Sequence, residues 1–331
     1  MSTHASMCTS AAILPIRDII RDIHDITTIP ITIIIQSDMR PLTTSFIGEV
    51  INTKKRNNLL CYERSMEQLT QICKDALYKA HVALDALSER GVCEVYNKHV
   101  TDISTQGDMA VSETLTRFFK EQKIPAVLYS EESGRTELTR NPEYTITFDD
   151  IDGTDNYHRG RGMLPYCTVV TIFDSPEPNF ENALVAGVIE HNSKRIWHAV
   201  RDNGCYLNGL RVNTTGRKNL DRRTLVIIDH YTSGRDISRF LRIYPESWVK
   251  DFGSAAFHLA VVSSGLFDAH LSHSQKAHEL GAGYLLIKEA GGFLADWGDK
   301  ALDRTRYDFD AKYSIVAAST KELGKKLLSK L

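Results

Sequence analysis

FDDIDGTDN (Phe148–Asn156) is the stretch that decides how this sequence is interpreted. Four aspartates fall within seven residues, Asp149, Asp150, Asp152 and Asp155, with a glycine and a threonine among them. Like charges this close repel each other, so a folded chain must either leave them in water or neutralise them. A solvated acidic turn is the plainer explanation, because aspartate is a common turn residue.

Two predicted strands run into acidic residues. The strand Thr145–Phe148 ends directly before the aspartates, and the apolar run at residues 126–130 ends directly before Glu131 and Glu132. We expect both strand ends to lie at the same edge of one sheet, which would gather their carboxylates. Mg²⁺ is held in proteins by a few carboxylates together with water and substrate phosphate. The strand ends therefore favour a magnesium site over a solvated turn.

Gly153 and Thr154 suggest a second function for the same stretch. Glycine permits a tight backbone and close approach, and successive N–H groups can cradle a phosphate oxygen. Cations on one side and amides on the other would stabilise the charge that develops in phosphoryl transfer. The alternative is that Thr154 only caps the segment that follows.

Length and composition describe an ordinary globular protein. The chain has 331 residues, enough for one large or two medium domains with a proper core. A net charge of -2 without a basic block gives no support to nucleic-acid binding. The cysteines are scattered without a CxxC pair, so we expect reduced thiols rather than disulfides or a zinc site. The six are Cys8, Cys61, Cys73, Cys93, Cys167 and Cys205.

The N-terminal part has an irregular pattern. AAILPI (Ala11–Ile16) and IPITIII (Ile29–Ile35) are apolar, but neither approaches the roughly 20 residues of a membrane span. Arginines follow the first run, which is the wrong order for a signal peptide. We therefore expect no membrane association and a cytoplasmic location. Residues 1–65 are interpreted as an extension of unknown role, with the globular unit starting at Met66.

Periodicity predicts the elements of the globular unit. Apolar residues spaced by three and four from Met66 to Leu87 predict an amphipathic helix, and a second helix is expected over Asp108–Gln122. Strands and helices then alternate, and two Asn-Gly steps within residues 201–209 indicate a hairpin. We place the boundary between two subdomains, 66–210 and 211–331, where a strand gives way to the charged stretch NTTGRKNLDRR.

Six segments together resemble one family. DDIDGTDN is similar to the DPIDGT-N motif of the inositol monophosphatase family, a superfamily of Mg²⁺-dependent, lithium-sensitive-type phosphatases that includes fructose-1,6-bisphosphatase and bisphosphate nucleotidase. The other matching segments are DISTQGDMAVSE, YSEESG, AVRDNGCYLNGLRV, GSAAFHLAVVSSGLFDAH and HELGAGYLLIKEAGG. Each is weak alone, but six in the right order are specific. The resemblance covers roughly Met66 to the C-terminus.

The resemblance implies a fold and a set of site residues. The fold is a layered αβαβα sandwich of α+β and α/β subdomains, with the first subdomain binding metal and phosphate. Two or three Mg²⁺ ions would be ligated by Glu131, Asp149, the Ile151 carbonyl, Asp152 and Glu279, with Asp149 bridging two of them. Gly153, Thr154 and Ser254 would bind the phosphate. Asp108 and the Thr154 hydroxyl would be catalytic, orienting a water molecule at the metal site and helping to deprotonate it. Asp150 would point away from the metals, and Asp155 would lie on the surface.

Two departures from the family pattern concern the C-terminal motif. His278-Glu279 replaces the usual tryptophan-aspartate; Glu279 keeps the carboxylate on a longer side chain, and His278 is expected to be a packed histidine or a neighbour of the metal site. Ser272 stands where inositol-specific members carry a glutamate that binds sugar hydroxyls. His273 and Lys276 could instead meet an anionic substrate, or the loop could simply be solvated.

The predicted function is Mg²⁺-dependent hydrolysis of a small phosphate monoester by a phosphoric monoester hydrolase. The residues do not choose among inositol phosphates, fructose 1,6-bisphosphate, a 3′-phosphoadenosine nucleotide and histidinol phosphate. The resemblance further implies a homodimer. The alternative is a catalytically weakened pseudophosphatase that acts as a binding or scaffold protein, favoured by His278, Glu279 and the N-terminal extension.

Overall fold

The computed structural model describes residues 44–88, 95–99, 102–160, 162–229 and 238–331. Contacts between Cα atoms divide the chain into two compact units, Met1–Gln68 and Leu69–Leu331. The site residues predicted from the sequence all belong to the second unit. The two apolar runs near the N-terminus lie outside the described residues, so the predictions about them stay predictions. Among the described residues, no helix is both long and apolar enough to cross a membrane.

Helix α2 (Thr44–Ser88) begins well before Met66, where the apolar spacing placed its start. The prediction was wrong because the regular apolar spacing begins only at Met66, whereas α2 also includes residues 44–65, a stretch without proline in which the polar run NTKKRNN (Asn52–Asn58) interrupts the apolar residues. The expected buried face is confirmed from Met66 onward, where the side chains of Leu69, Cys73 and Leu77 are inaccessible to solvent.

The first large sheet has eight strands in the order β10-β9-β8-β7-β6-β5-β3-β4. The turn at Asn208-Gly209, whose φ angles of 49° and 81° are both positive, closes the hairpin predicted there. The strands are β3 (Ala126–Ser130), β4 (Gly134–Glu137), β5 (Tyr144–Asp152), β6 (Cys167–Phe173), β7 (Ala183–Glu190), β8 (Arg195–Val200), β9 (Gly204–Leu207) and β10 (Leu210–Val212). A separate antiparallel pair joins β1 (Val95–His99) to β2 (Asp102–Thr105).

Strands β3 and β5 are parallel neighbours, with Ser130 opposite Phe148. This pairing confirms that the two acidic strand ends lie at one edge of the sheet. The predicted end of β5 at Phe148 was wrong, because the strand continues through Asp152 with every residue buried. Its pairing with β6 is irregular between Asp149 and Asp152, which marks a bulge in the acidic stretch.

The second sheet has five strands in the order β12-β11-β13-β15-β14. They are β11 (Leu225–Ile228), β12 (Trp248–Lys250), β13 (Ala269–Lys276), β14 (Phe293–Asp296) and β15 (Lys312–Ala318). Along the chain, the first sheet ends at Val212 and the second begins at Leu225. The division of the unit into subdomains 66–210 and 211–331 stays a prediction.

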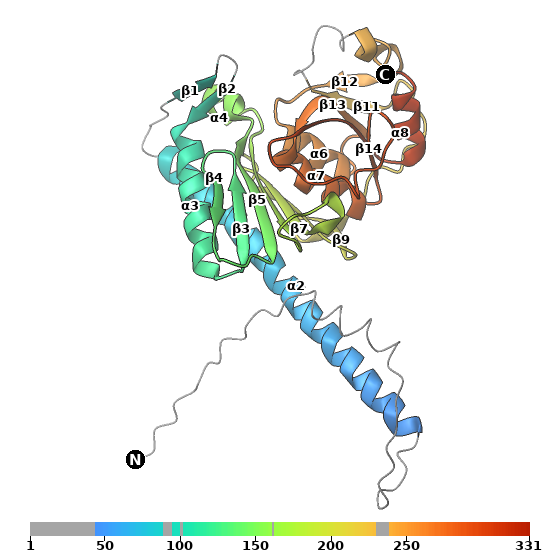
Figure 1. Cartoon of the computed structure of the whole chain (residues 1–331). Coiled ribbons are helices and arrows are strands. Elements are labelled where there is room, and N and C mark those ends of the chain that lie inside the picture. Colours follow the sequence, from blue (N-terminus) through green and yellow to red (C-terminus); the bar gives the residue numbers. More distant parts are fainter. Residues whose placement is uncertain (1–43, 89–94, 100–101, 161, 230–237) are drawn as a thin grey trace, which may run out of the picture. The chain divides into compact units, whose positions relative to one another are not determined.

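Helices complete an αβαβα sandwich (Figure 1). Helices α6 and α7 pack between the two sheets, and their apolar side chains share one core with the first sheet and β15. Helix α3 contacts β5 on the first sheet, and α8 covers the second sheet. The helices are α3 (Gln106–Gln122), α4 (Thr154–Gly160), α6 (Ala255–Ser263), α7 (Ala277–Glu289) and α8 (Lys321–Leu328). The layered fold expected from the sequence is confirmed.

Three cysteines are described with their side chains, and all three are buried free thiols: Cys73, Cys167 and Cys205. Burial raises the pKa of Cys205 to about 11, which keeps the thiol protonated and unreactive at neutral pH. The expectation of reduced thiols is confirmed for these three, and the other cysteines lie outside the described side chains.

We expect a chain shortened to begin at Met66 to fold with a melting temperature within about 4 °C of the full chain. The first buried side chain described in α2 is Met66, and a change of 1 kcal/mol shifts the melting temperature of a domain this large by about 2–4 °C. Calorimetry on both chains measures the difference in melting temperature. Insoluble protein, or a much larger drop, would show that residues 1–65 stabilise the fold.

Candidate active site

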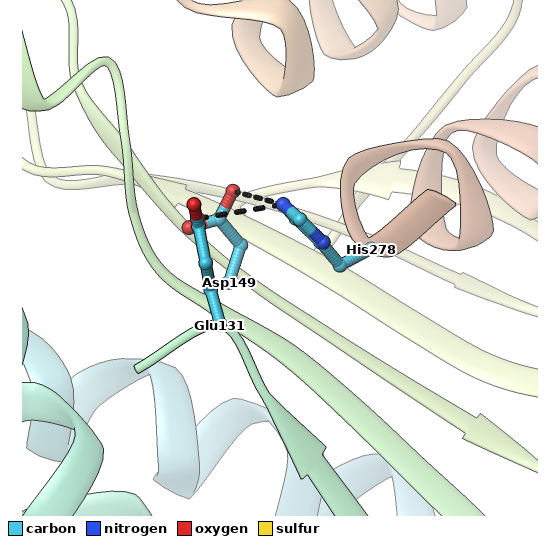
Figure 2. Close-up of side chains that lie close together, drawn as sticks. All are labelled: Glu131, Asp149 and His278. Atoms are coloured by element: carbon cyan, nitrogen blue, oxygen red, sulfur yellow. Dashed lines mark ion pairs between the residues drawn. The ribbon is translucent and has the colours of Figure 1, made fainter. Parts of the chain in front are cut away.

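Carboxylates from both predicted strand ends and from the first turn of α7 meet in two groups. Glu131, Asp149 and His278 form one group, and Asp149, Asp152 and Glu279 form the other. Within each group the possible ligand atoms all lie within 4.8 Å of one another. Figure 2 shows the first group, with the imidazole of His278 directed at the two carboxylates. Asp149 belongs to both groups, so it is the shared member of the cluster.

The second group is buried and electrostatically unfavourable as it stands. Burial raises the pKa of Asp149 well above its usual value, and repulsion from Glu131, Asp152 and Glu279 adds to the effect. Burial likewise raises the pKa of Glu279 well above normal, with Asp152 as its strongest repelling neighbour. The carboxylates are thus held together in a place where their ionised forms need a counter-charge.

Glu131 lies beside an ammonium and an imidazole. Its Oε1 accepts a hydrogen bond of 2.8 Å from the Lys276 ammonium, and its Oε2 lies 3.4 Å from His278 Nε2. Burial alone would raise the pKa of Glu131, but His278 and Lys276 hold it well below its usual value. The sequence had suggested Lys276 as a contact for an anionic substrate; the structure places its ammonium against the carboxylate cluster.

Asp152 connects the two halves of the sandwich. Its carboxylate accepts hydrogen bonds from Ser254 Oγ at 2.5 Å, from the Ala255 N–H at 3.1 Å and from the Ala256 N–H at 2.8 Å. It therefore caps the N-terminus of α6, where a negative charge is favoured. Ser254 is buried and donates to this carboxylate, and its predicted contact with phosphate stays a prediction.

Gly153 and Thr154 follow directly on the cluster. Gly153 has φ of 88°, and a Cβ there would lie 3.1 Å from the Gly253 carbonyl oxygen, so only glycine fits without strain. Thr154 Oγ1 lies 3.3 Å from Asp108 Oδ1 and 3.0 Å from the Ile151 carbonyl oxygen. The predicted pair of Thr154 and Asp108 is thus in hydrogen-bond contact beside the acidic strand.

Asp108 is fixed by a capping box at the start of α3. Its Oδ2 accepts hydrogen bonds from the Thr105 N–H at 2.7 Å and the Thr105 hydroxyl at 2.6 Å. Burial raises the pKa of Asp108 to about 7, even though the bonds from Thr105 favour the ionised form. A carboxyl with this pKa is suited to accept a proton near neutral pH.

The other two aspartates of the opening stretch lie outside both groups. Asp150 is buried and accepts hydrogen bonds from Ser130 Oγ at 2.9 Å and the Glu132 N–H at 3.1 Å. Asp155 is exposed, and its Oδ1 lies 3.4 Å from Nε of Arg159 one helical turn later. The structure therefore separates four neighbouring acids into two cluster members, one structural residue and one surface residue.

Two polar neighbours of the cluster were not predicted as site residues. Gln275 donates a hydrogen bond to Glu279 Oε2, and Ser272 donates one of 3.1 Å to Asp229. Both residues flank an irregularity in the pairing of β13 with β15. Bulges of this kind leave no distinct signal in the sequence, so the side of the strand that faces the acids could not be read from residue types.

A divalent cation fits the residues present. Both carboxylate oxygens of Asp149 are buried and have no hydrogen-bond partner among the described residues, although His278 lies 3.6 Å from Oδ2. Buried polar atoms are normally paired, so free oxygens between further carboxylates are the arrangement expected of ligands. Glu131, Asp149, Asp152 and Glu279 supply the oxygen donors that Mg²⁺ prefers.

The fold and the acidic cluster define a layered α/β protein with a group of carboxylates that could hold cations at one edge of its first sheet. The inositol monophosphatase family model matches residues 65–331, and the chain belongs to this family.

Relatives and solved structures agree with that assignment. The Nus factor SuhB of Pseudomonas aeruginosa is 27% identical over 239 residues, which cover 70% of this chain and 83% of that protein. A fructose-1,6-bisphosphatase/inositol-1-monophosphatase of Methanothermobacter thermautotrophicus is 26% identical over 217 residues, covering 62% and 75%. The crystal structure of the extragenic suppressor protein SuhB from Bartonella henselae has a similar fold, with a TM-score of 0.69 and 19% identity over 80% of this chain and 98% of that one.

Proposed function

We propose that this chain is a Mg²⁺-dependent phosphatase that hydrolyses a small phosphate monoester. One observation carries the proposal: Glu131, Asp149, Asp152 and Glu279 come from three separate segments and gather in two groups that share the buried Asp149. Membership of a phosphatase family, together with the hydrogen-bonded pair of Thr154 and Asp108 beside the cluster, supports it.

Two cation positions are supported by the two groups of the cluster. Asp149, Asp152 and Glu279 would hold one ion, and Glu131 and Asp149 would hold a second near the Ile151 carbonyl. A bound divalent cation would supply positive charge for the phosphate oxygens and lower the pKa of water. The protein itself orients these carboxylates: the three donors to Asp152 and the Lys276 contact to Glu131 fix their directions.

Asp108 and Thr154 provide a route for a proton. The Thr154 hydroxyl has one proton and two acceptors in reach, Asp108 Oδ1 and the Ile151 carbonyl oxygen. When Thr154 donates to Asp108, the lone pairs of its oxygen are free to accept a hydrogen bond from a water molecule placed beside the cluster. The proton released from that water then moves toward Thr154 Oγ1 as the Thr154 proton moves to Asp108. A phosphate group beside this pair would accept hydrogen bonds from the backbone N–H groups of Gly153 and Thr154.

The test of the proposed function is phosphate release from a panel of substrates, with and without Mg²⁺. The panel comprises inositol monophosphates, fructose 1,6-bisphosphate, a 3′-phosphoadenosine nucleotide and histidinol phosphate, compared by kcat/KM. Ser272 lies buried against Asp229 where inositol-specific members carry a glutamate, which favours the substrates other than inositol monophosphate. No release from any of the four would refute the proposal.

We expect kcat/KM at saturating Mg²⁺ to fall about tenfold for each pH unit below about 7. Burial raises the pKa of Asp108 to about 7, and only its ionised form accepts a proton, so the active fraction declines as pH drops through that value. Asp108→Asn should lose this acidic limb and about 10²–10⁴-fold in rate. The exposed Asp155→Asn is the control and should keep the wild-type profile; an unchanged profile in Asp108→Asn would contradict the assignment.

The proposed assembly is a homodimer, as the family resemblance implies. Light scattering, which gives the molecular mass in solution, tests it.

The alternative of a pseudophosphatase gains no support from the comparisons. The chain also retains the acidic cluster, Thr154 and Asp108, which a phosphatase of this family would need. The name Nus factor describes the SuhB relatives and is not carried over to this chain.

A further inference from the structure

His278 stands out because its imidazole is buried and makes only long ion-pair contacts among the described residues. The side chain is 5% exposed, and neither ring nitrogen has a hydrogen-bond partner among the described residues. A packed histidine in a core normally satisfies at least one nitrogen, since an unpaired buried polar atom is costly. The ring nevertheless has a defined position, because Phe309 packs against it with 5.0 Å between ring centroids.

The free Nε2 faces two carboxylate oxygens. It lies 3.4 Å from Glu131 Oε2 and 3.6 Å from Asp149 Oδ2, as Figure 2 shows. Two ligands bound at 2.0–2.1 Å to one ion in tetrahedral geometry are themselves about 3.4 Å apart. Both distances are long for hydrogen bonds and close to the separation of two ligands of one ion, and the possible ligand atoms of all three residues lie within 4.8 Å of one another.

The opposite side of Glu131 is already occupied. Lys276 binds Oε1 at 2.8 Å, which leaves Oε2 directed toward His278. The lysine ammonium fixes the carboxylate without using the oxygen that faces the imidazole. The imidazole thus faces the carboxylates of Glu131 and Asp149, with the Lys276 ammonium on the far side of Glu131, while Asp152 and Glu279 repel Asp149 from the other group.

We propose that His278 Nε2 is a nitrogen ligand of a first-row transition-metal ion held together with Glu131 and Asp149. Imidazole favours metals such as Co²⁺, Zn²⁺ and Fe²⁺, whereas an all-oxygen set suits Mg²⁺. The group of Asp149, Asp152 and Glu279 has only carboxylates and stays a Mg²⁺ position. This inference rests on the proposed function and refines it, because it makes the site selective for two different metals.

The test measures metal binding without substrate. The full chain is stripped with a chelator and titrated with Co²⁺, whose visible absorption reports its ligands, in the presence of increasing Mg²⁺. Wild-type protein should retain one Co²⁺ against a large excess of Mg²⁺. His278→Phe keeps an aromatic ring beside Phe309 and should weaken Co²⁺ binding tenfold or more, on the scale of the roughly 10- to 100-fold losses seen when metal-site partners are removed.

A matched control is His198→Phe. His198 is 7% exposed and packs on Tyr206 with 5.0 Å between ring centroids, yet it belongs to neither carboxylate group. The His198→Phe protein should bind Co²⁺ as the wild type does. Equal Co²⁺ affinity in wild type and His278→Phe would overturn the inference.

A second measurement does not depend on any variant folding. Pulsed EPR of Mn²⁺ bound to the wild-type chain should show coupling to a histidine nitrogen, identified by ¹⁵N-histidine labelling. Absence of nitrogen coupling would overturn the inference and leave the phosphatase proposal standing, provided that phosphate is released. Nitrogen coupling without phosphate release from any substrate would support the metal site and refute the phosphatase.

Discussion

Asp149→Asn is expected to lower the rate of phosphate release by about 10²–10³-fold or more, while the protein stays folded. Asp149 belongs to both carboxylate groups, so its charge contributes to both cation positions. Asparagine keeps the shape of the side chain and removes the charge. Because burial raises the pKa of Asp149 and its neighbours repel it, the variant should melt no lower than the wild type in the absence of metal.

Asp150→Asn is the control for this prediction. Asp150 is the next residue and is equally buried, but it hydrogen-bonds to Ser130 and the Glu132 N–H instead of joining the cluster. Its substitution should cost stability through those bonds, with turnover retained. Phosphate release and thermal melting of both variants measure the difference. If Asp149→Asn keeps more than a few per cent of wild-type turnover, the assignment of Asp149 to two cations is wrong.

Glu279→Gln is expected to raise the Mg²⁺ concentration needed for activity and to lower kcat about tenfold or more, as loss of other site charges does. Glu279 lies in the first turn of α7, buried against Asp149 and Asp152, and Gln275 donates to its Oε2. Glutamine removes the negative charge without changing the size of the side chain. Mg²⁺ titration of activity measures the shift.

Glu279→Asp tests the length of the side chain separately from its charge, because aspartate keeps the carboxylate and is one methylene shorter. Helix α7 packs closely on the first sheet, since a Cβ on Gly281 would lie 3.2 Å from Thr171 Oγ1. The helix therefore has little freedom to approach the acids, and the shorter aspartate should fall short of the ion and lower activity. A rise in activity would mean that glutamate is a compromised ligand in a weakened phosphatase. Unchanged Mg²⁺ dependence in both variants would exclude Glu279 as a ligand.

The position of the acidic cluster was predictable because it depends on local patterns. Two short apolar runs that end in acids predicted strands, and strands β3 and β5 pair in parallel with those ends together. Gly153, with its positive φ, occupies a position that only glycine fills without strain. Glycine at position 281 likewise allows a close contact between α7 and the first sheet.

The neighbours of the cluster were not predictable, because tertiary packing decides them. Whether Lys276 would point to solvent or to Glu131 depends on the irregular pairing of β13 with β15. The sequence favoured a packed histidine at position 278 over a neighbour of the metal site, and the evidence for the second comes from its nitrogens, which have no hydrogen-bond partner among the described residues. The start of α2 was missed because the polar run Asn52–Asn58 interrupts the apolar residues that precede Met66.

The residues of the acidic cluster are synthesised far apart in time, which affects when the cluster can form. Strand β5 ends at Asp152, and α7, which brings Glu279, begins only at Ala277. At synthesis rates of about 5–20 residues per second, the nascent chain carries exposed aspartates for roughly 6–25 s before their last partner arrives. Water screens their repulsion during that interval. The four carboxylates can therefore meet only after α7 has been synthesised, so the complete cluster forms late and does not nucleate the fold.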